Sequence, residues 1–344
     1  MSQRARNRVK GALFEAQVRF LLKKSGYKPI EPDGRLIRED KIRGRGGWHQ
    51  IDAFGYYSYG VPCLYPVRII CEAKNYDGRV GLPVIRNFVG AFKDIAENYF
   101  VERLGSAANY LLTKRYTDAG VIFSARGFTP QAQDYAYAQG VFLVSYEDNP
   151  VLSPLLERSN DLIDSLDITN AARNSSVFKK WIYAKMENPT EVFEEDSLFS
   201  TERLGPILEE HAQLIRNIRT SYLGTASGIY PIHLLSRSGI PWRLFGNRDE
   251  ISCRIYYHVG TENCLEIVPQ GADHIRFYIS IPREVVANYR DRYRDRMRML
   301  DFKKQFFEYV DIPVQREGIR RILTFRLDTE WITQLRRRRR RTHF

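Results

Sequence analysis

The sequence predicts an α/β domain over residues 1–150, followed by a second, α+β domain over residues 151–344. The chain has 344 residues, and compact domains usually hold about 100–200 residues. Strand and helix patterns alternate over the first 150 residues, as they do in α/β domains. The alternation stops near Pro150, where mainly helical sequence begins. These observations together indicate two domains.

The elements of the first domain follow from apolar spacing and from residues that interrupt regular structure. Residues 6–25 carry apolar side chains at helical spacing and are followed by Gly26, which predicts an amphipathic helix. The basic, glycine-rich segment 41–48 predicts a loop. Strands rich in β-branched or aromatic residues are expected at 50–57 and 67–74, paired like a hairpin. The pattern continues with a helix, a strand, a helix and a strand at residues 82–100, 120–124, 129–139 and 141–145.

The second half combines helices with short strands. Residues 151–223 are expected to be mainly helical with an acidic interruption at 187–196, and short strands are expected over 228–281. A long helix from about 283 to 309, a strand at 322–327 and a short helix complete the domain. The consecutive arginines from Arg336 to Arg341 predict a basic, disordered C-terminal tail that adds non-specific affinity for polyanions.

Composition and charge indicate a globular protein with a polyanionic partner. Hydrophobic residues make up 43% of the chain, and 53 Lys and Arg against 41 Asp and Glu give a net charge of +12, which favours nucleic acid. No apolar run approaches the roughly 18–20 residues that span a bilayer, and the basic N-terminus lacks the apolar core of a signal peptide. We therefore expect a cytoplasmic protein with no membrane partner. The scattered Cys63, Cys71, Cys253 and Cys264 form no C-x-x-C pair, which fits reduced thiols rather than disulfides or a zinc site.

The candidate residues for catalysis lie on the two strands of the expected hairpin. Glu72 and Lys74 point to one face of their strand because side chains alternate, while Cys71 and Ala73 point to the other. Asp52 begins the preceding strand, so pairing of the two strands would bring its carboxylate to Glu72. Two adjacent carboxylates repel unless a cation lies between them. Mg²⁺ takes such oxygen ligands, and Lys74 would orient or deprotonate a water or offset charge on a phosphate.

Each of these residues also has an ordinary structural interpretation. Glu72 and Lys74 can form a plain ion pair, Asp52 can be a turn residue, and Glu15 can be a solvated helix position. A bare E-x-K tripeptide is weakly specific in a chain this charged. An apolar strand, however, should not end in two charges on one face without a reason, so the combined pattern favours a metal site.

The order of several short motifs resembles the Mrr-like branch of the PD-(D/E)XK nucleases. These motifs are Gly11-x-x-Phe14-Glu15, Gly-Gly-x-x-Gln-Ile-Asp52, Cys-Glu-Ala-Lys74-Asn, Gly120-Val-Ile-Phe-Ser, Gly127-Phe-Thr-Pro-x-Ala132 and Gly140-Val-Phe-Leu-Val, and together they cover residues 8–148. The resemblance implies a mixed sheet flanked by helices and Mg²⁺-dependent cleavage of DNA, with Mn²⁺ as a substitute. It also implies site roles: Asp52, Glu72 and Ala73 hold the metal, Lys74 is the catalytic lysine and Glu15 completes the pocket. Ile51 replaces the proline of the family name, and Glu72 stands where many Mrr-like members carry glutamine.

Four further residues are candidates for binding nucleic acid. Arg43, Arg45 and Trp48 lie in the segment leading to Asp52, where guanidinium groups can contact phosphate and an aromatic ring can stack on a base. Asn75 follows the lysine and can hold a phosphate, although a turn role explains it equally well. The alternative for the arginine segment is a solvated loop.

Three functions remain open at the level of sequence. The first is an Mg²⁺-dependent DNA endonuclease in prokaryotic restriction or anti-phage defence, with the second domain controlling targeting or activation by binding a modified base, a nucleotide signal or a partner protein. The second is a non-catalytic nucleic-acid-binding protein on a nuclease scaffold. The third is a repair or RNA nuclease with the same metal site. Duplex cleavage often requires two active sites, which is compatible with a homodimer.

Overall fold

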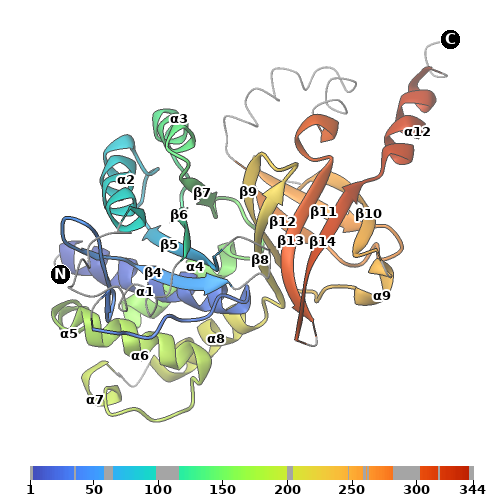
Figure 1. Ribbon diagram of the computed structural model, residues 1–344. Helices are drawn as coiled ribbons and strands as arrows, with labels where there is room; N and C mark the ends of the chain where they lie inside the picture. Colours follow the sequence, from blue (N-terminus) through green and yellow to red (C-terminus); the bar gives the residue numbers. More distant parts are fainter. Residues whose placement is uncertain are drawn as a thin grey trace. The chain divides into compact units, whose positions relative to one another are not determined.

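The chain forms two compact units in the computed structural model, drawn in Figure 1. The structure describes residues 3–34, 36–57, 65–97, 116–199, 204–246, 248–258, 261, 263–281, 303–316 and 318–340. Unit 1 comprises Met1–Leu143 and Arg158–Ala212, and unit 2 comprises Val144–Glu157 and Gln213–Phe344. The division therefore differs from a single boundary near Pro150, because helices that follow this residue pack on the N-terminal helix.

Unit 1 is built on a mixed four-stranded sheet. Its strands are β4 (Ala53–Tyr57), β5 (Val67–Lys74), β6 (Thr117–Ser124) and β7 (Phe142–Ser145), hydrogen-bonded in that order. β4 and β5 run antiparallel, whereas β5 and β6 run parallel. The predicted hairpin-like pair and the later strands are confirmed, and β5 has the predicted bounds.

Three helices pack against this sheet or against each other. They are α1 (Gln3–Lys24), α2 (Leu82–Ala96) and α3 (Pro130–Ala138). α1 contacts β4 and β5, and α2 contacts β6 and α3. Gly26, with φ of 87°, follows α1 in the left-handed conformation that glycine adopts without strain. The Thr129 side chain accepts a hydrogen bond from the Ala132 N–H and caps α3. All three predicted helices are confirmed, although the expected end of the second, near residue 100, lies outside the described residues.

The middle of the chain is helical, as predicted, and covers α1. Its helices are α4 (Ser153–Ser165), α5 (Ile168–Arg173), α6 (Ser175–Glu187), α7 (Asp196–Phe199) and α8 (Leu204–Arg216). α5 and α6 contact α1. The buried Gln17 of α1 donates a hydrogen bond of 2.7 Å to the Ser159 hydroxyl, and its Nε2 lies 3.0 Å from His211 Nε2. These contacts explain why the helical region joins unit 1.

The segment expected to be a loop at residues 41–48 is instead part of a small antiparallel sheet. β1 (Ile37–Arg38), β2 (Lys41–Arg43) and β3 (Trp48–Gln50) pair in that order. The Gly44 N–H donates to the Gly47 carbonyl at 2.7 Å, which closes the turn between β2 and β3. The loop prediction is therefore wrong, because the glycines occupy only the turn and the residues on either side form strands.

Unit 2 contains a closed barrel. Its strands are β8 (Thr220–Ala226), β9 (Tyr230–Ser236), β10 (Glu250–Tyr257), β11 (Cys264–Pro269), β12 (Phe277–Ser280), β13 (Tyr309–Arg316) and β14 (Ile319–Leu327). The order around the barrel is β10-β11-β12-β9-β8-β13-β14, and parallel pairing of β10 with β14 closes it. Ile255, Ile267 and Phe325 belong to its buried core. Two helices, α9 (Trp242–Phe245) and α12 (Thr329–Arg340), accompany the barrel.

Several expectations for the second half need comment. The long helix expected over 283–309 lies largely outside the described residues, and its end is wrong because Tyr309 begins β13. α12 continues to Arg340, so residues 336–340 are helical where we expected disorder, and Arg341 is outside the described residues. Cys63 is also outside them, whereas Cys71, Cys253 and Cys264 are buried free thiols. No helix in the described part of the chain is both long and apolar enough to cross a membrane.

Candidate active site

The pairing of β4 with β5 brings Asp52 to the Glu72–Lys74 end of the sheet. Ala53 lies opposite Cys71 in the ladder, so Asp52 is adjacent to the position of Glu72. The Asp52 Oδ2 accepts a hydrogen bond of 2.8 Å from the Ala73 N–H. The carboxylate of Asp52 is thereby fixed to the backbone of the strand that carries the other two polar groups.

Lys74 bridges the two carboxylates. Its Nζ contacts the Glu72 carboxylate directly and lies 3.6 Å from Asp52 Oδ2. The contact confirms that Glu72 and Lys74 extend from the same face of β5, as alternation predicts. The structure thus brings together the three residues that the sequence singled out on these strands.

Glu15 joins the group from helix α1. Its carboxylate side chain is only 14% exposed, and its buried Oε2 contacts the Nζ of Lys179 on α6. Sequence reasoning missed Lys179, because it lies in the helical region beyond Pro150 and no motif marks it. The site therefore draws on β4, β5, α1 and α6.

The electrostatics show that the carboxylates influence one another. Burial raises the pKa of Glu15 from its ordinary value of 4.5 to about 7, and the negative charge of Asp52 contributes. Burial, followed by Asp52, also raises the pKa of Glu72. Burial alone would lower the pKa of Lys74, but the charges of Asp52 and Glu72 raise it above its ordinary range. A cation placed among these acids would relieve their repulsion.

The donor set fits a hard divalent cation. Among the described residues no three His, Cys, Asp or Glu side chains are arranged as a ready-made metal site. Mg²⁺, however, is usually held by only one or two carboxylates, with waters and substrate phosphate as its other ligands. Asp52 and Glu72 supply two such carboxylates, and Ala73 lies between the two polar residues of β5. The ligands implied by the resemblance are thus compatible with the geometry and remain a prediction.

A cavity of about 260 Å³ opens beside Glu15 and Lys74. A side chain at Gly11 would meet no atom within 4 Å, so this turn of α1 leaves the space free. Asn75 also lines the cavity, and its contact with a phosphate stays a prediction. The remaining lining residues are Asn7, Ala73, Tyr76 and Asp77.

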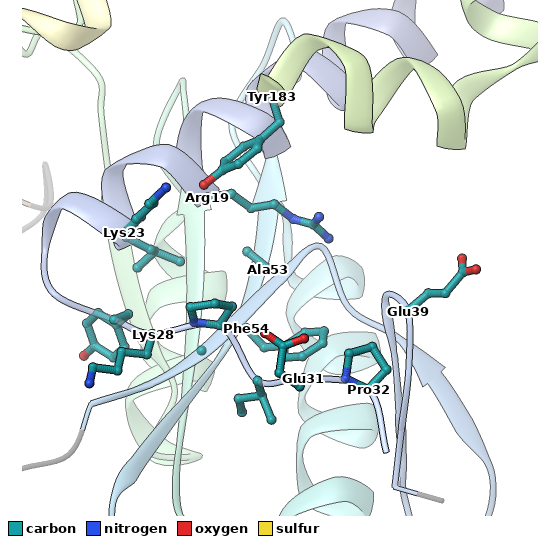
Figure 2. A pocket seen from close by; sticks show the side chains of 14 residues that line it. Arg19, Lys23, Lys28, Glu31, Pro32, Glu39, Ala53, Phe54 and Tyr183 are labelled. Carbon is teal, nitrogen blue, oxygen red and sulfur yellow. The ribbon is translucent and has the colours of Figure 1, made fainter. Parts of the chain in front are cut away.

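A second cavity, of about 430 Å³, is lined in part by Ala53 and Phe54, which follow Asp52 in the chain (Figure 2). Arg19 lines this cavity (Figure 2), and its Nε donates a hydrogen bond of 2.8 Å to the backbone carbonyl of Asp52. Tyr183 of α6 lines the same cavity. Helix α1 therefore fixes the backbone of Asp52 as well as carrying Glu15.

The arginine and tryptophan residues of the β2–β3 hairpin divide into two groups. The Trp48 ring lies 4.5 Å from the guanidinium carbon of Arg38 and 5.7 Å from that of Arg43. Arg45 instead forms an exposed ion pair of 3.0 Å with Glu97. The structure thus groups Trp48 with Arg43 and with Arg38, which sequence reasoning missed because its strand lies outside the glycine-rich segment.

His49 has a structural explanation. Its Nε2 lies 2.6 Å from Asp94 Oδ2, and the Gly46 N–H also donates to the Asp94 carboxylate. Asp94 thereby connects helix α2 to the hairpin.

Comparisons with known proteins identify a family for the N-terminal part of the chain. Residues 6–148 match the model of the Mrr_cat family, described as a restriction endonuclease. The match confirms the resemblance of this stretch to the Mrr-like restriction endonucleases that the motifs indicated. No curated protein matches the chain. A solved structure titled "Crystal Structure of Protein of Unknown Function AF1548" is similar at 15% identity and a TM-score of 0.34, covering 60% of this chain and 98% of that chain, which is too distant to carry an inference.

Proposed function

We propose that this chain, with a restriction endonuclease domain at residues 6–148, hydrolyses DNA phosphodiester bonds with the help of Mg²⁺, for which Mn²⁺ can substitute. The observation that carries the proposal is the contact of Lys74 with both Asp52 and Glu72 beside an open cavity. A scaffold that only binds nucleic acid has no need of this buried, mutually repelling group.

The protein residues divide the work as follows. Asp52 and Glu72 would hold the metal, which would polarise the scissile phosphate and lower the pKa of water. Asp52 is held by the Ala73 N–H, so its carboxylate needs little reorganisation. Lys74 keeps its positive charge beside two carboxylates and offsets charge that develops on the phosphate. Glu15 lines the cavity, where its carboxylate can accept a proton.

The substrate is DNA, and the hairpin supplies contacts to it. The chain carries a net charge of +12, which favours phosphate. Arg38, Arg43 and Trp48 combine guanidinium groups with an aromatic face, which suits phosphate contact and base stacking. Arg45 has a carboxylate partner already, and we give it a smaller part.

The finer expectations stay proposals of the same kind. We propose a cytoplasmic role in prokaryotic restriction or anti-phage defence, with the barrel of unit 2 controlling targeting or activation. A modified base, a nucleotide signal or a partner protein would be its ligand. A homodimer would supply the second site needed to cut both strands of a duplex.

The decisive experiment measures cutting and binding separately. The purified chain is incubated with plasmid DNA, linear duplex, single strands and RNA, with Mg²⁺, Mn²⁺ or EDTA. Asp52→Ala, Glu72→Ala and Lys74→Ala should each abolish cleavage while DNA binding stays within about threefold, because binding rests on many phosphate contacts. Glu209→Ala, at an exposed position of α8, is the matched control and should cut normally. Normal cutting by the Glu72 and Lys74 variants would show that the assigned site is wrong, and cutting of RNA alone would change the substrate.

A further inference from the structure

Lys179 is a charged side chain of the site that comes from outside the matched family residues. It lies on α6, which begins at Ser175, whereas the family match ends at residue 148. α6 contacts α1 along its length. Lys179 is 22% exposed, and its Nζ meets the buried Oε2 of Glu15. Burial raises the pKa of Glu72, and the charge of Lys179 opposes a small part of that rise.

Two ion pairs between α1 and α6 determine which residue of α6 lies next to Glu15. Ion pairs join Glu15 to Lys179 and Lys23 to Glu187, about two helical turns further along both helices. Residues of α1 and α6 between the two pairs, Arg19 and Tyr183, line one cavity. The charges are reversed from one pair to the other. An α6 that ran in the opposite direction would therefore face like charges, which costs stability.

Two residues on one face of α1, Glu15 and Arg19, connect Lys179 to the backbone of Asp52. Glu15 forms an ion pair with Lys179, and one turn later the Arg19 side chain donates a hydrogen bond to the backbone carbonyl of Asp52. A shift of α6 relative to α1 would therefore move Glu15 with respect to Asp52. An isolated surface ion pair contributes about 0–1 kcal/mol, but this pair is largely buried and belongs to a site with two further carboxylates.

We propose that Lys179 is a positioning residue of the nuclease site, which holds Glu15 at the cavity that Lys74 also lines and offsets part of the negative charge of the carboxylates. The inference rests on the proposed function. When all three carboxylates are ionised, Lys74 and Lys179 leave the site with one net negative charge. A divalent cation and a phosphodiester anion together carry one positive charge, so the loaded site would be neutral. The active site therefore extends beyond the family domain into α6.

The test uses the full chain and a matched control. Lys179→Met removes the charge and keeps the length of the side chain, and Lys179→Gln is the second variant for use if methionine disturbs the packing of α6. Lys180→Met makes the same change at the next, exposed position of α6. Lys179→Arg keeps the charge. Circular dichroism first verifies that each variant is folded. Mn²⁺ binding is then measured by electron paramagnetic resonance, and DNA cleavage is measured separately.

The expected results separate positioning from packing. Lys179→Met should lower kcat by about tenfold or more with KM for DNA within about threefold, and Lys179→Arg should restore most of kcat. Mn²⁺ should bind Lys179→Met about three- to tenfold more tightly, since a repelling charge has gone. In a Glu15→Gln background the further effect of Lys179→Met on kcat should be under about twofold, because the two residues act as a unit.

Other outcomes overturn the proposal. An unchanged kcat, an equal loss in the Glu15→Gln background, or Mn²⁺ binding that weakens would each show that Lys179 only supports helix packing. If the wild type cuts no nucleic acid but binds Mn²⁺, the nuclease proposal fails. The Mn²⁺ affinity of Lys179→Met then still shows whether the charge of Lys179 acts on the metal site. If the wild type binds no Mn²⁺, both proposals fail.

Discussion

Glu15→Gln should stabilise the protein at alkaline pH and change it little at acidic pH. The glutamine mimics a protonated glutamate, whereas the native carboxyl has its pKa raised from 4.5 to about 7 by burial and by Asp52. A raised pKa means that the folded state holds the proton more tightly than the unfolded state does. Folding stability therefore falls as pH rises from about 4.5 to 7, and above pH 7 the loss is complete at about 3 kcal/mol. The side chain is only 14% exposed, so screening by solvent reduces this value little.

The assay is urea unfolding of wild type and variant side by side, followed by circular dichroism from pH 5 to 8. The barrel of unit 2 is the same in both proteins, so its transition cancels in the comparison. The difference in free energy of unfolding should grow from below about 1 kcal/mol at pH 5 to about 3 kcal/mol at pH 8. Glu209→Gln, at an exposed position of α8, should stay within about 0.5 kcal/mol of wild type throughout. A difference that is constant with pH, or a wild type that gains on the variant at pH 8, would refute the placement of Glu15 beside Asp52.

Three further predictions concern the substrate path and the folding unit. Replacing Arg38 and Arg43 by alanine should weaken DNA binding and flatten its salt dependence by about two phosphate contacts, whereas Arg45→Ala should have a smaller effect; titrations at several salt concentrations measure the slopes. Gly11→Leu should lower cleavage by about tenfold because the side chain enters the cavity, without loss of helix stability, and Gly11→Ala should cut normally; unaltered cutting by the leucine variant would place the substrate elsewhere. A fragment ending near Pro150 lacks the helices that cover α1 and should not unfold cooperatively, which a thermal melt would show; a sharp melting transition would contradict this.

Much of the strand pair at the candidate site could be predicted from sequence because its signals are local. Alternation along β5 places Glu72 and Lys74 on one face whatever the rest of the chain does. The short connection from β4 to β5 favours antiparallel pairing, and this pairing determines the place of Asp52. The apolar spacing of α1 likewise predicts a helix without any knowledge of its neighbours.

The parts that sequence could not predict depend on contacts between distant segments. Nothing local distinguishes Lys179 from the exposed Lys180, and only packing of α6 on α1 selects it. Arg38 joins Trp48 through the pairing of β1 with β2 and of β2 with β3. Closure of the barrel depends on β10 meeting β14, a pairing between strands far apart in the chain that no alternation pattern specifies.

The extension of the site into α6 connects catalysis to the way in which α1 is held. α1 carries Glu15, fixes the backbone of Asp52 through Arg19, and is anchored by the buried contacts of Gln17 with Ser159 and His211. The burial that raises the pKa of Glu15 thus depends on helices outside the family domain. These helices must stabilise a site whose carboxylates repel one another, and their packing offsets that cost. It follows that substitutions in the α1–α6 contact should alter cleavage even where they touch neither the metal ligands nor the substrate.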